Sequence, residues 1–290
     1  MGRKKPIKTW STPVSKKGYS FIPCALCGGS QFNRALLCEG FSYVRCARCG
    51  LVQINPQPSD AARRYRDTYG KDYLLYELAN EAAFLDLQLL ALKDAGFDDL
   101  EEELIRRTAA PRALDIGCAT GALLLRLRER GWCVTGVEIS PSAGYARETR
   151  GLDVRSLPLE ENRFSSDSFD LILASHLIEH LNAPGLFVRE VYRLLRPGGH
   201  FLVSTPNITG FQARLFGSGW RSAIFDHLYL FSVWTLKALL SGAGFIIEGV
   251  YTWGGLAAGV APVWLKKIAD RVVKPLGQGD VMLIRARKGF

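Results

Sequence analysis

Hydrophobic residues in the second half of the chain form short uninterrupted runs that alternate with amphipathic stretches. Such runs predict buried strands, because a strand covered on both faces carries apolar side chains on both. The runs lie at residues 113–116, 133–137, 171–174, 201–204, 245–250 and 281–285. Apolar residues at helical spacing separate them at residues 122–130, 184–195 and 232–241. The alternation predicts an α/β fold with a mostly parallel sheet and helices on both faces.

The first half of the chain has a different pattern. Residues 59–110 are predicted to be helical because leucines recur at roughly helical spacing, at positions 74, 75, 78, 85, 89 and 92. The segment before them ends at Asn55-Pro56-Gln57-Pro58, a natural boundary. We therefore divide the chain into a basic tail predicted to be disordered, a cysteine-bearing module, a helical linker or cap, and an α/β domain. Their bounds are 1–20, 21–55, 56–110 and 111–290, with an insertion in the last near 207–231.

The module contains two CxxC pairs separated by 18 residues. The pairs are Cys24 with Cys27 and Cys46 with Cys49, and glycine follows each pair. Two such knuckles supply four thiolates in a tetrahedral set suited to Zn²⁺. A four-thiolate site has no open coordination position, so we expect a structural zinc ribbon.

The net charge of +9 is concentrated at the start of the chain. Residues 1–17 hold six Lys and Arg residues and no acid, so nine minus six leaves +3 for the remainder. Four zinc-bound thiolates would lower this by about two more. A nearly neutral body has no broad attraction to a phosphate backbone, so no nucleic-acid partner is expected. Contact between the basic tail and an anionic membrane surface stays open.

Neither a signal peptide nor a membrane span is predicted. The basic start leads into no apolar segment, and the longest uncharged stretch, residues 249–265, contains four glycines and a proline. We interpret that stretch as a buried strand and loop. The cysteine pattern points to metal and reduced thiols in a cytoplasmic protein, with Cys38, Cys118 and Cys133 predicted as buried thiols.

A glycine-bearing turn follows the first apolar run of the α/β part. In Leu114-Asp115-Ile116-Gly117-Cys118-Ala119-Thr120-Gly121, the two glycines let the backbone approach a ligand. The next strand ends in Glu138, about twenty residues further on, where a carboxylate is placed to grip a ribose diol. The turn is neither GxGxxG nor a P-loop. The combination predicts a nucleoside-containing cofactor.

The stretch from residue 113 onward resembles class I S-adenosylmethionine-dependent methyltransferases, in particular the ubiquinone-biosynthesis O-methyltransferase branch. The matching segments are LDIGCATG (114–121), VEIS (137–140), SFDLILASHLIEHL (168–181), RLLRPGGHFLVSTPN (193–207), HLYLFS (227–232) and AGF (243–245). With the cysteine pairs, the chain looks like bacterial methyltransferases of this branch that carry an N-terminal zinc ribbon. The resemblance implies a Rossmann-like methyltransferase fold with a seven-stranded sheet, preceded by that ribbon.

The resemblance also implies roles for individual residues. The methionine part of S-adenosylmethionine would lie against Asp115, Gly117 and Gly121, and its ribose against Glu138. Adenine would meet the loop before residue 169, with Leu159 and Glu160 as the candidates for this contact. Further candidates for cofactor binding are Cys118, Ile139 and Ser175. Ser175 and His176 would face the sulfonium and the acceptor.

Histidine is the commonest base for taking a proton from a hydroxyl acceptor, and the chain has only four. His180, His227 and His176 are the candidate catalytic residues, whereas His200 is predicted to be structural. His176, Glu179 and His180 would share one face if their segment were helical. Some ubiquinone-pathway relatives are understood to hold a divalent metal here with two acids and a histidine. A second metal at these three residues is one interpretation, and a hydrogen-bonded helix cap is the other.

The insertion near 207–231 is rich in aromatic residues that either wall an acceptor pocket or pack a helical cap. We expect the acceptor to be a small molecule, a hydroxyl of a sugar, lipid-linked or natural-product intermediate, with carbon and nitrogen acceptors left open. Two alternatives are an RNA methyltransferase that grips RNA with the ribbon and a non-catalytic zinc-ribbon interaction protein. The near-neutral body and the absence of an NPPY-like motif after residue 173 count against the first. The complete cofactor turn counts against the second. The sequence predicts no oligomeric state.

Overall fold

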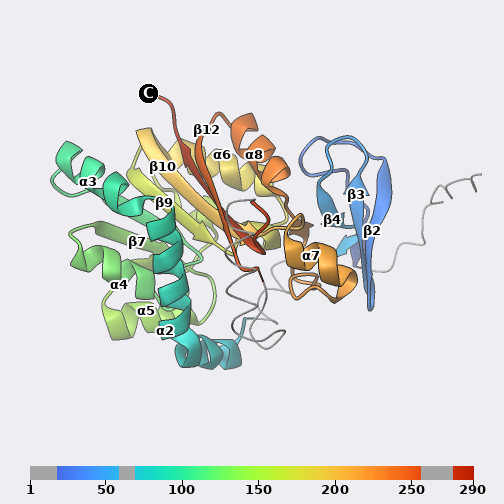
Figure 1. Cartoon of the computed structure of the whole chain (residues 1–290). Helices are drawn as coiled ribbons and strands as arrows, with labels where there is room; N and C mark the ends of the chain where they lie inside the picture. Colours follow the sequence, from blue (N-terminus) through green and yellow to red (C-terminus); the bar gives the residue numbers. More distant parts are fainter. Residues whose placement is uncertain (1–17, 59–68, 256–276) are drawn as a thin grey trace, which may run out of the picture.

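The structure is a computed structural model that describes residues 18–58, 69–255 and 277–290. The predictions for the tail before residue 18, for residues 59–68 and for the uncharged stretch beyond residue 255 lie outside these residues. A seven-stranded sheet forms the centre of the α/β part, and a four-stranded sheet lies beside it at the right of Figure 1.

The seven-stranded sheet has the order β12-β13-β10-β9-β6-β7-β8. Its strands are β6 (Arg112–Ile116), β7 (Cys133–Val137), β8 (Val154–Arg155), β9 (Phe169–Ser175), β10 (Leu195–Pro206), β12 (Ile246–Trp253) and β13 (Val281–Arg287). All neighbours pair in parallel except β13, which runs antiparallel to both β10 and β12. The predicted mostly parallel, seven-stranded sheet is confirmed. The two-residue strand β8 is the one that no apolar run indicates.

Helices cover both faces of this sheet. They are α2 (Lys71–Asp94), α3 (Phe97–Arg107), α4 (Ala122–Glu129), α5 (Ser142–Arg150), α6 (Pro184–Leu194) and α8 (Val233–Gly242). Successive residues of β9 point to opposite faces, so Leu171 and Leu173 pack with α2, α3 and α4 in one hydrophobic cluster. Ile172 and Ala174 belong to the cluster that contains α6 and α8. This two-sided burial explains why the strands read as continuous apolar runs.

The four-stranded sheet joins the cysteine module to the α/β domain. It has the order β11-β4-β3-β2, with β2 (Phe32–Cys38), β3 (Phe41–Cys46) and β4 (Val52–Ile54) from the module. The fourth strand, β11 (Tyr229–Leu230), comes from the end of the insertion near 207–231 and pairs antiparallel with β4. A short pair, β1 (Tyr19–Ser20) with β5 (Gln57–Pro58), closes the module at its ends. The module and the insertion therefore share backbone hydrogen bonds.

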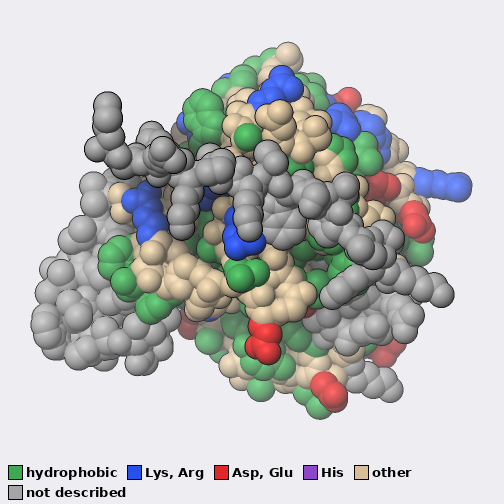
Figure 2. All heavy atoms as spheres, turned by 90° about the vertical axis from the view of Figure 1, so that its right-hand side faces the viewer, with side chains coloured by type: hydrophobic (Ala, Val, Ile, Leu, Met, Phe, Trp, Pro, Cys, Tyr) green, Lys and Arg blue, Asp and Glu red, His purple; other side chains and the backbone are tan. Residues whose placement is uncertain are grey.

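Aromatic residues of the insertion contribute mainly to packing. Trp220 is 2% exposed and donates from Nε1 to Asp280 Oδ1 at 2.5 Å, and Tyr229 is fully buried. Phe211 and Phe216, on α7 (Phe211–Phe216), are each 37% exposed. On the face that carries the module, Lys and Arg side chains stand singly or in small groups among uncharged ones (Figure 2). None of the described helices combines the length and the apolar character that crossing a membrane requires.

Candidate functional site

The turn between β6 and α4 has a backbone that few residues adopt. Gly117 and Gly121 have φ of 77° and 78°, and Ala119 between them has φ of 48°. A non-glycine residue in the left-handed region persists only where its surroundings enforce it. The Gly117 amide donates to Val137 O at 2.8 Å, which holds the turn against the end of β7. The two glycines thus have the backbone conformation that lets the turn approach a bound ligand closely.

Glu138 supplies the remaining support for this turn. Its side chain is 5% exposed, and Oε2 accepts from the Ala119 amide at 3.1 Å. Oε1 accepts from the Ser140 amide at 2.8 Å. The carboxylate predicted to grip a ribose therefore also fixes the strained residue of the cofactor turn.

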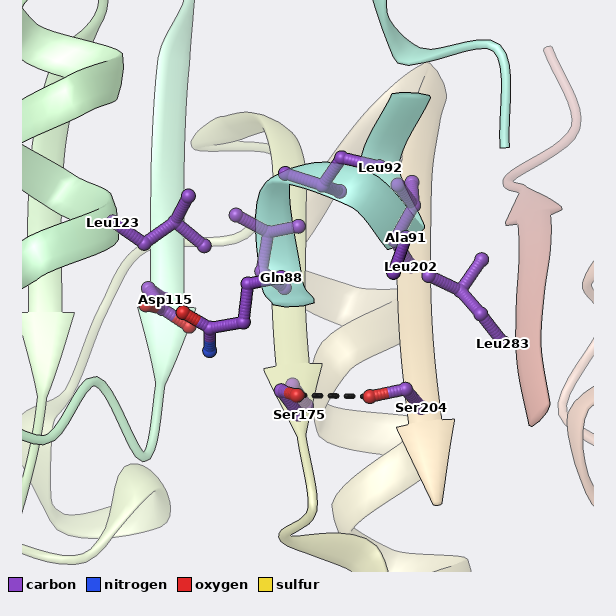
Figure 3. Close-up of a pocket in the computed structure, with 11 residues that line it drawn as sticks. Gln88, Ala91, Leu92, Asp115, Leu123, Ser175, Leu202, Ser204 and Leu283 are labelled. Atoms are coloured by element: carbon purple, nitrogen blue, oxygen red, sulfur yellow. Dashed lines mark hydrogen bonds between the residues drawn. The ribbon is translucent and has the colours of Figure 1, made fainter. Parts of the chain in front are cut away.

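Asp115 lies at the edge of a small cavity of about 30 Å³ between α2 and the sheet. Figure 3 shows Gln88 of α2 pointing toward Asp115, and Ser175 hydrogen-bonded to Ser204, with Oγ atoms 2.9 Å apart. The cavity has room for one or two water molecules. Burial, with a further contribution from the charge of Glu138, raises the pKa of Asp115 to about 7.

Helix α2 contributes polar residues to the site that no motif of the sequence singles out. Glu81 forms an ion pair with Arg150, whose Nη2 donates to both carboxylate oxygens at 2.6 and 2.7 Å, and it accepts from Thr120 Oγ1 of the cofactor turn at 2.5 Å. Glu77 accepts from Ser142 Oγ, just beyond β7. Burial and the nearby Glu138 and Glu81 charges raise the pKa of Glu77 to about 7. The helix predicted as a linker or cap is therefore tied directly to the cofactor turn.

The other predicted cofactor residues occupy varied environments. The Cys118 thiol is buried in a small cluster with α5 residues, and burial raises its pKa well above the usual range. Ile139 is 42% exposed beside Glu138. On the short helix Leu159–Asn162, Leu159 is buried in the core and Glu160 is exposed. Of these, Ile139 presents an accessible apolar surface next to the turn.

The segment after β9 is not an α-helix, so the expected common face of His176, Glu179 and His180 is wrong. Only Ile178–His180 form a single 3₁₀ turn, and His176 has φ of 51°. His176 Nδ1 lies 3.4 Å from Glu179 Oε1, and 49% of the His176 side chain is exposed. Glu179 itself is fully buried, and its Oε2 accepts from Thr205 Oγ1 at 2.9 Å.

His227 joins Glu179 and His180 in place of His176. One ligand atom from each of these three residues lies within 4.8 Å of the others. The two imidazole rings meet edge to face with centroids 4.7 Å apart. His180 Nδ1 lies 3.0 Å from Asp226 O and His227 Nδ1 lies 2.8 Å from Ser222 O. A carbonyl only accepts, so each neutral ring carries its proton on Nδ1 and its lone pair on Nε2.

We call Glu179, His180 and His227 the Glu-His-His cluster. Its members differ in their charge at neutral pH. Burial alone would raise the pKa of Glu179, but the interaction with His176 and the histidine charges lower it to about 2. Burial lowers the pKa of His227 to about 4. At neutral pH the cluster is thus a buried carboxylate beside a neutral imidazole. The contact of Glu179 Oε1 with His176 Nδ1, at 3.4 Å, is too long for a well-formed hydrogen bond, so the set suits a proton or a divalent cation.

The cluster and the cofactor turn are neighbours. A Cβ added to Gly117 would lie 3.5 Å from the Leu177 side chain, so the loop after β9 packs on the turn. Tyr69, just before α2, stands edge to face with Tyr73 at 4.7 Å and with His180 at 6.1 Å. Burial and then the charge of Glu77, with smaller contributions from Tyr76, Glu138 and Asp226, raise the pKa of Tyr73 to about 12. The start of α2 therefore connects the two halves of the site.

The four cysteines of the module come together as a second cluster. Cys24 and Cys49 have Sγ atoms 3.4 Å apart, those of Cys27 and Cys46 are 3.5 Å apart, and all four lie within 4.8 Å. A tetrahedral zinc with Zn–S bonds of 2.3 Å needs sulfur separations of about 3.8 Å, so the set fits Zn²⁺. No disulfide forms among the seven cysteines. Cys133 is exposed, which corrects the prediction that it is buried, whereas Cys118 is buried and Cys38 half-buried.

Comparisons with known proteins agree with this fold. A sequence model described as "Methyltransferase domain" matches residues 81–249. A ubiquinone biosynthesis O-methyltransferase of Caulobacter vibrioides is 36% identical over 104 residues, which cover 33% of this chain and 41% of that protein. A probable S-adenosylmethionine-dependent methyltransferase of Mycolicibacterium smegmatis is 34% identical over 164 residues, covering 54% of this chain and 61% of that protein. The matched stretch thus spans about two fifths to three fifths of these relatives.

A solved structure supports the fold alone. Phosphoethanolamine N-methyltransferase 2 of Haemonchus contortus, in complex with S-adenosyl-L-methionine, superposes with a TM-score of 0.59 at 18% identity. The superposition covers 82% of this chain and 63% of that one. Because the family match spans more than half of the residues, the chain belongs to the methyltransferase-domain family, and its α/β domain is of the class I S-adenosylmethionine-dependent type.

Proposed function

We propose that the protein transfers the methyl group of S-adenosylmethionine to a hydroxyl of a small-molecule acceptor. The observation that carries the proposal is the Glu-His-His cluster beside the cofactor turn. A hydroxyl must lose its proton as it accepts a methyl group, whereas many nitrogen acceptors need no such base. The relatives named as O-methyltransferases agree with this choice.

The cofactor would lie along the carboxyl ends of β6 and β7. Asp115 and the turn 117–121 would meet its methionine part and Glu138 its ribose, and adenine would lie between the loop before residue 169 and the exposed Ile139. Ser175, at the end of β9, would face the sulfonium. S-adenosylmethionine supplies an electrophilic methyl group, so the protein needs mainly to align the acceptor and exclude water.

Proton removal is assigned to the two histidines. Each ring is oriented by a backbone carbonyl at Nδ1, which leaves Nε2 as its basic position, and Nε2 would take the proton. The acceptor oxygen gives its proton to this cluster while it forms a bond to the methyl carbon. The C–S bond breaks with its electron pair on sulfur, leaving S-adenosylhomocysteine. His180 is the preferred base because its segment follows β9 directly.

Two imidazole Nε2 atoms and a carboxylate are also a common ligand set for divalent transition metals. Glu179, His180 and His227 would hold such an ion, and their Nδ1 contacts are those expected of metal-binding histidines. A bound cation lowers the pKa of a coordinated hydroxyl. Whether the cluster acts as a base or holds a metal ion, it would assist removal of the acceptor proton. The content of transition metal in purified protein distinguishes the two roles.

The four-cysteine cluster is proposed to hold one structural zinc. The protein is proposed to be cytoplasmic. Its closed thiolate set leaves no position for an acceptor. Within residues 207–231, only the partly exposed aromatic residues would border an acceptor. We propose a sugar, lipid-linked or natural-product intermediate as the acceptor class.

Two measurements test the proposal. Calorimetry on dialysed protein should detect S-adenosylmethionine binding, and its absence would favour the non-catalytic interaction protein. Release of S-adenosylhomocysteine should then be screened against hydroxylated sugars, lipid-linked intermediates and phenols, with total RNA as a separate arm. Methylation of RNA and of no small hydroxyl would overturn the proposal in favour of the RNA methyltransferase. A His180→Ala control identifies turnover that depends on the site.

A further inference from the structure

The residues that orient both histidines of the Glu-His-His cluster belong to one short turn of the insertion. Ser222 O faces His227 Nδ1 and Asp226 O faces His180 Nδ1. The turn is closed by a hydrogen bond of 3.1 Å from the His227 amide to Ile224 O. Any shift of this turn would move both imidazole rings relative to Glu179.

This turn is attached to the cysteine module by backbone pairing. Strand β11 begins two residues after His227 and pairs with β4, with Tyr229 opposite Gln53 and Leu230 opposite Val52. The Ile54 amide donates to Leu228 O at 2.9 Å. The module thus holds the chain on the carboxyl-terminal side of His227.

Among the module side chains that reach the turn, Tyr43 makes the shortest contacts, and Cys38 Sγ lies 3.8 Å from Ala223 O. The Tyr43 hydroxyl lies 2.7 Å from both Ile224 O and His227 O, so its single proton is shared between the two carbonyls, and the residue is fully buried on β3. The hydroxyl therefore bridges the two ends of the turn. Phe41 extends this contact, since its ring lies edge to face with Tyr43 and with Phe225, both at 5.6 Å.

We propose that Tyr43 is a positioning residue that fixes the 222–227 turn and thereby sets the orientation of His227 and His180. The inference rests on the proposed function of these histidines. The contacts that hold the turn do not depend on that function. It gives the cysteine module a role in the site besides stability. Strand β3, which carries Tyr43, ends at Cys46 of the four-cysteine cluster, so the metal-binding fold and the histidine geometry share one strand.

The test uses the full ¹⁵N-labelled chain, whose four histidines are few enough to follow individually. Long-range ¹H–¹⁵N spectra report the tautomer of each imidazole and the exchange of its Nδ1 proton with water. Tyr43→Phe removes only the hydroxyl. We expect the Nδ1 protons of His227 and His180 to exchange about three- to tenfold faster, the scale of one net hydrogen bond. Zinc content and the affinity for S-adenosylhomocysteine should stay within twofold of wild type.

Tyr192→Phe is the matched control, because it removes a hydroxyl on α6 that has no contact with the turn. His200 serves as an internal reference through its Nε2 proton, because Nε2 lies 3.1 Å from Glu248 Oε2, and exchange of that proton is followed in the same spectra. Unchanged exchange in folded Tyr43→Phe would overturn the proposal. Equal acceleration at His200 would also overturn it, since that result means general destabilisation.

A second variant covers the case in which Tyr43→Phe does not fold. Phe225→Leu loosens the aromatic contact to the turn while keeping the Tyr43 hydroxyl. A selective acceleration at His227 and His180 would support the positioning role, and none would overturn it. None of these readouts requires methyl transfer, so failure of the proposed activity remains distinguishable.

Discussion

His180 Nδ1 lies 3.0 Å from the backbone oxygen of Asp226, a residue 46 positions further along the chain. The contact joins the loop after β9 to the insertion that carries His227. It brings two histidine rings and the buried Glu179 together at the carboxyl edge of the sheet, where open α/β sheets place their sites. The site is therefore complete only when the insertion is folded onto the domain.

Replacing His180 should affect turnover more than binding. His180→Ala is expected to lower kcat by about a hundredfold or more, the scale of losing a general base, with unchanged affinity for S-adenosylmethionine. His227→Ala should act more on the KM of the acceptor, because His227 belongs to the insertion whose partly exposed aromatic residues would border the acceptor. Steady-state kinetics with an acceptor found in the screen decide this. Full turnover in both variants would mean that proton removal depends on neither ring.

The cofactor affinity should depend on Glu138 in two ways. Glu138→Ala removes the predicted ribose contact and also the support of the Ala119 amide. Since a hydrogen bond to a charged group contributes about 1.5–3 kcal/mol, the Kd for S-adenosylmethionine should rise about ten- to a hundredfold. Glu138→Gln is the matched variant, because its amide oxygen keeps one acceptor for the turn. Calorimetry giving a wild-type Kd for Glu138→Ala would show that the ribose lies elsewhere.

Purified protein should contain about one zinc per chain. Replacing Cys24 and Cys27 by serine should remove it, because two thiolates alone do not complete the tetrahedral set. The exposed Cys133 lies outside the cluster, so Cys133→Ser should keep the metal and serves as the control. Elemental analysis of protein prepared without chelator measures both. Zinc-free wild-type protein would remove the ribbon interpretation.

Much of the fold could be predicted because its signals are local. Strands buried on both faces, such as β6 and β9, read as continuous apolar runs. The cofactor turn and Glu138 lie in order within a short stretch, so chemistry and spacing identify them together. Strand β8 has only two residues and no periodicity, so no pattern indicates it. Glu77 and Glu81 of α2 read as ordinary solvent-facing helix residues, although both face the cofactor segments.

The sequence predicts which histidines belong to the candidate site, but it does not predict which of them lie together. His180 and His227 stand out individually as candidate bases, yet a helical repeat wrongly groups His180 with His176. A positive φ at His176 breaks that repeat. Histidine adopts this region more often than most non-glycine residues, but it does so in only a minority of cases, so the residue type alone does not locate the break. Tyr43 lies 184 positions from His227, so only the folded chain reveals their contact. Contacts of this kind depend on the tertiary fold.

The buried carboxyl of Asp115 gives a prediction about pH. Its pKa in the folded chain is about 7, raised by burial and by Glu138 from an ordinary value of 3.8. Between these values the folded state binds more protons than the unfolded state, so this group makes stability fall as pH rises from about 4 to 7. The slope from one group reaches at most about 1.4 kcal/mol per pH unit. Above pH 7 both states are ionised, and the contribution becomes constant.

Asp115→Asn should abolish this contribution and be relatively more stable at pH 8 than at pH 5, compared with wild type. Urea unfolding at the two pH values measures the change, and Glu160→Gln, which removes an exposed carboxyl, is the control. The same variant should bind S-adenosylmethionine more weakly if Asp115 meets the methionine ammonium, because an amide lacks the opposing charge. Calorimetry in buffers of different ionisation enthalpy should then show proton release on binding to wild type near pH 7, and none to Asp115→Asn. An equal pH dependence of stability in both proteins would mean that Asp115 titrates as an ordinary carboxyl. In that case its burial beside Glu138 would have to be relieved by water in the neighbouring cavity.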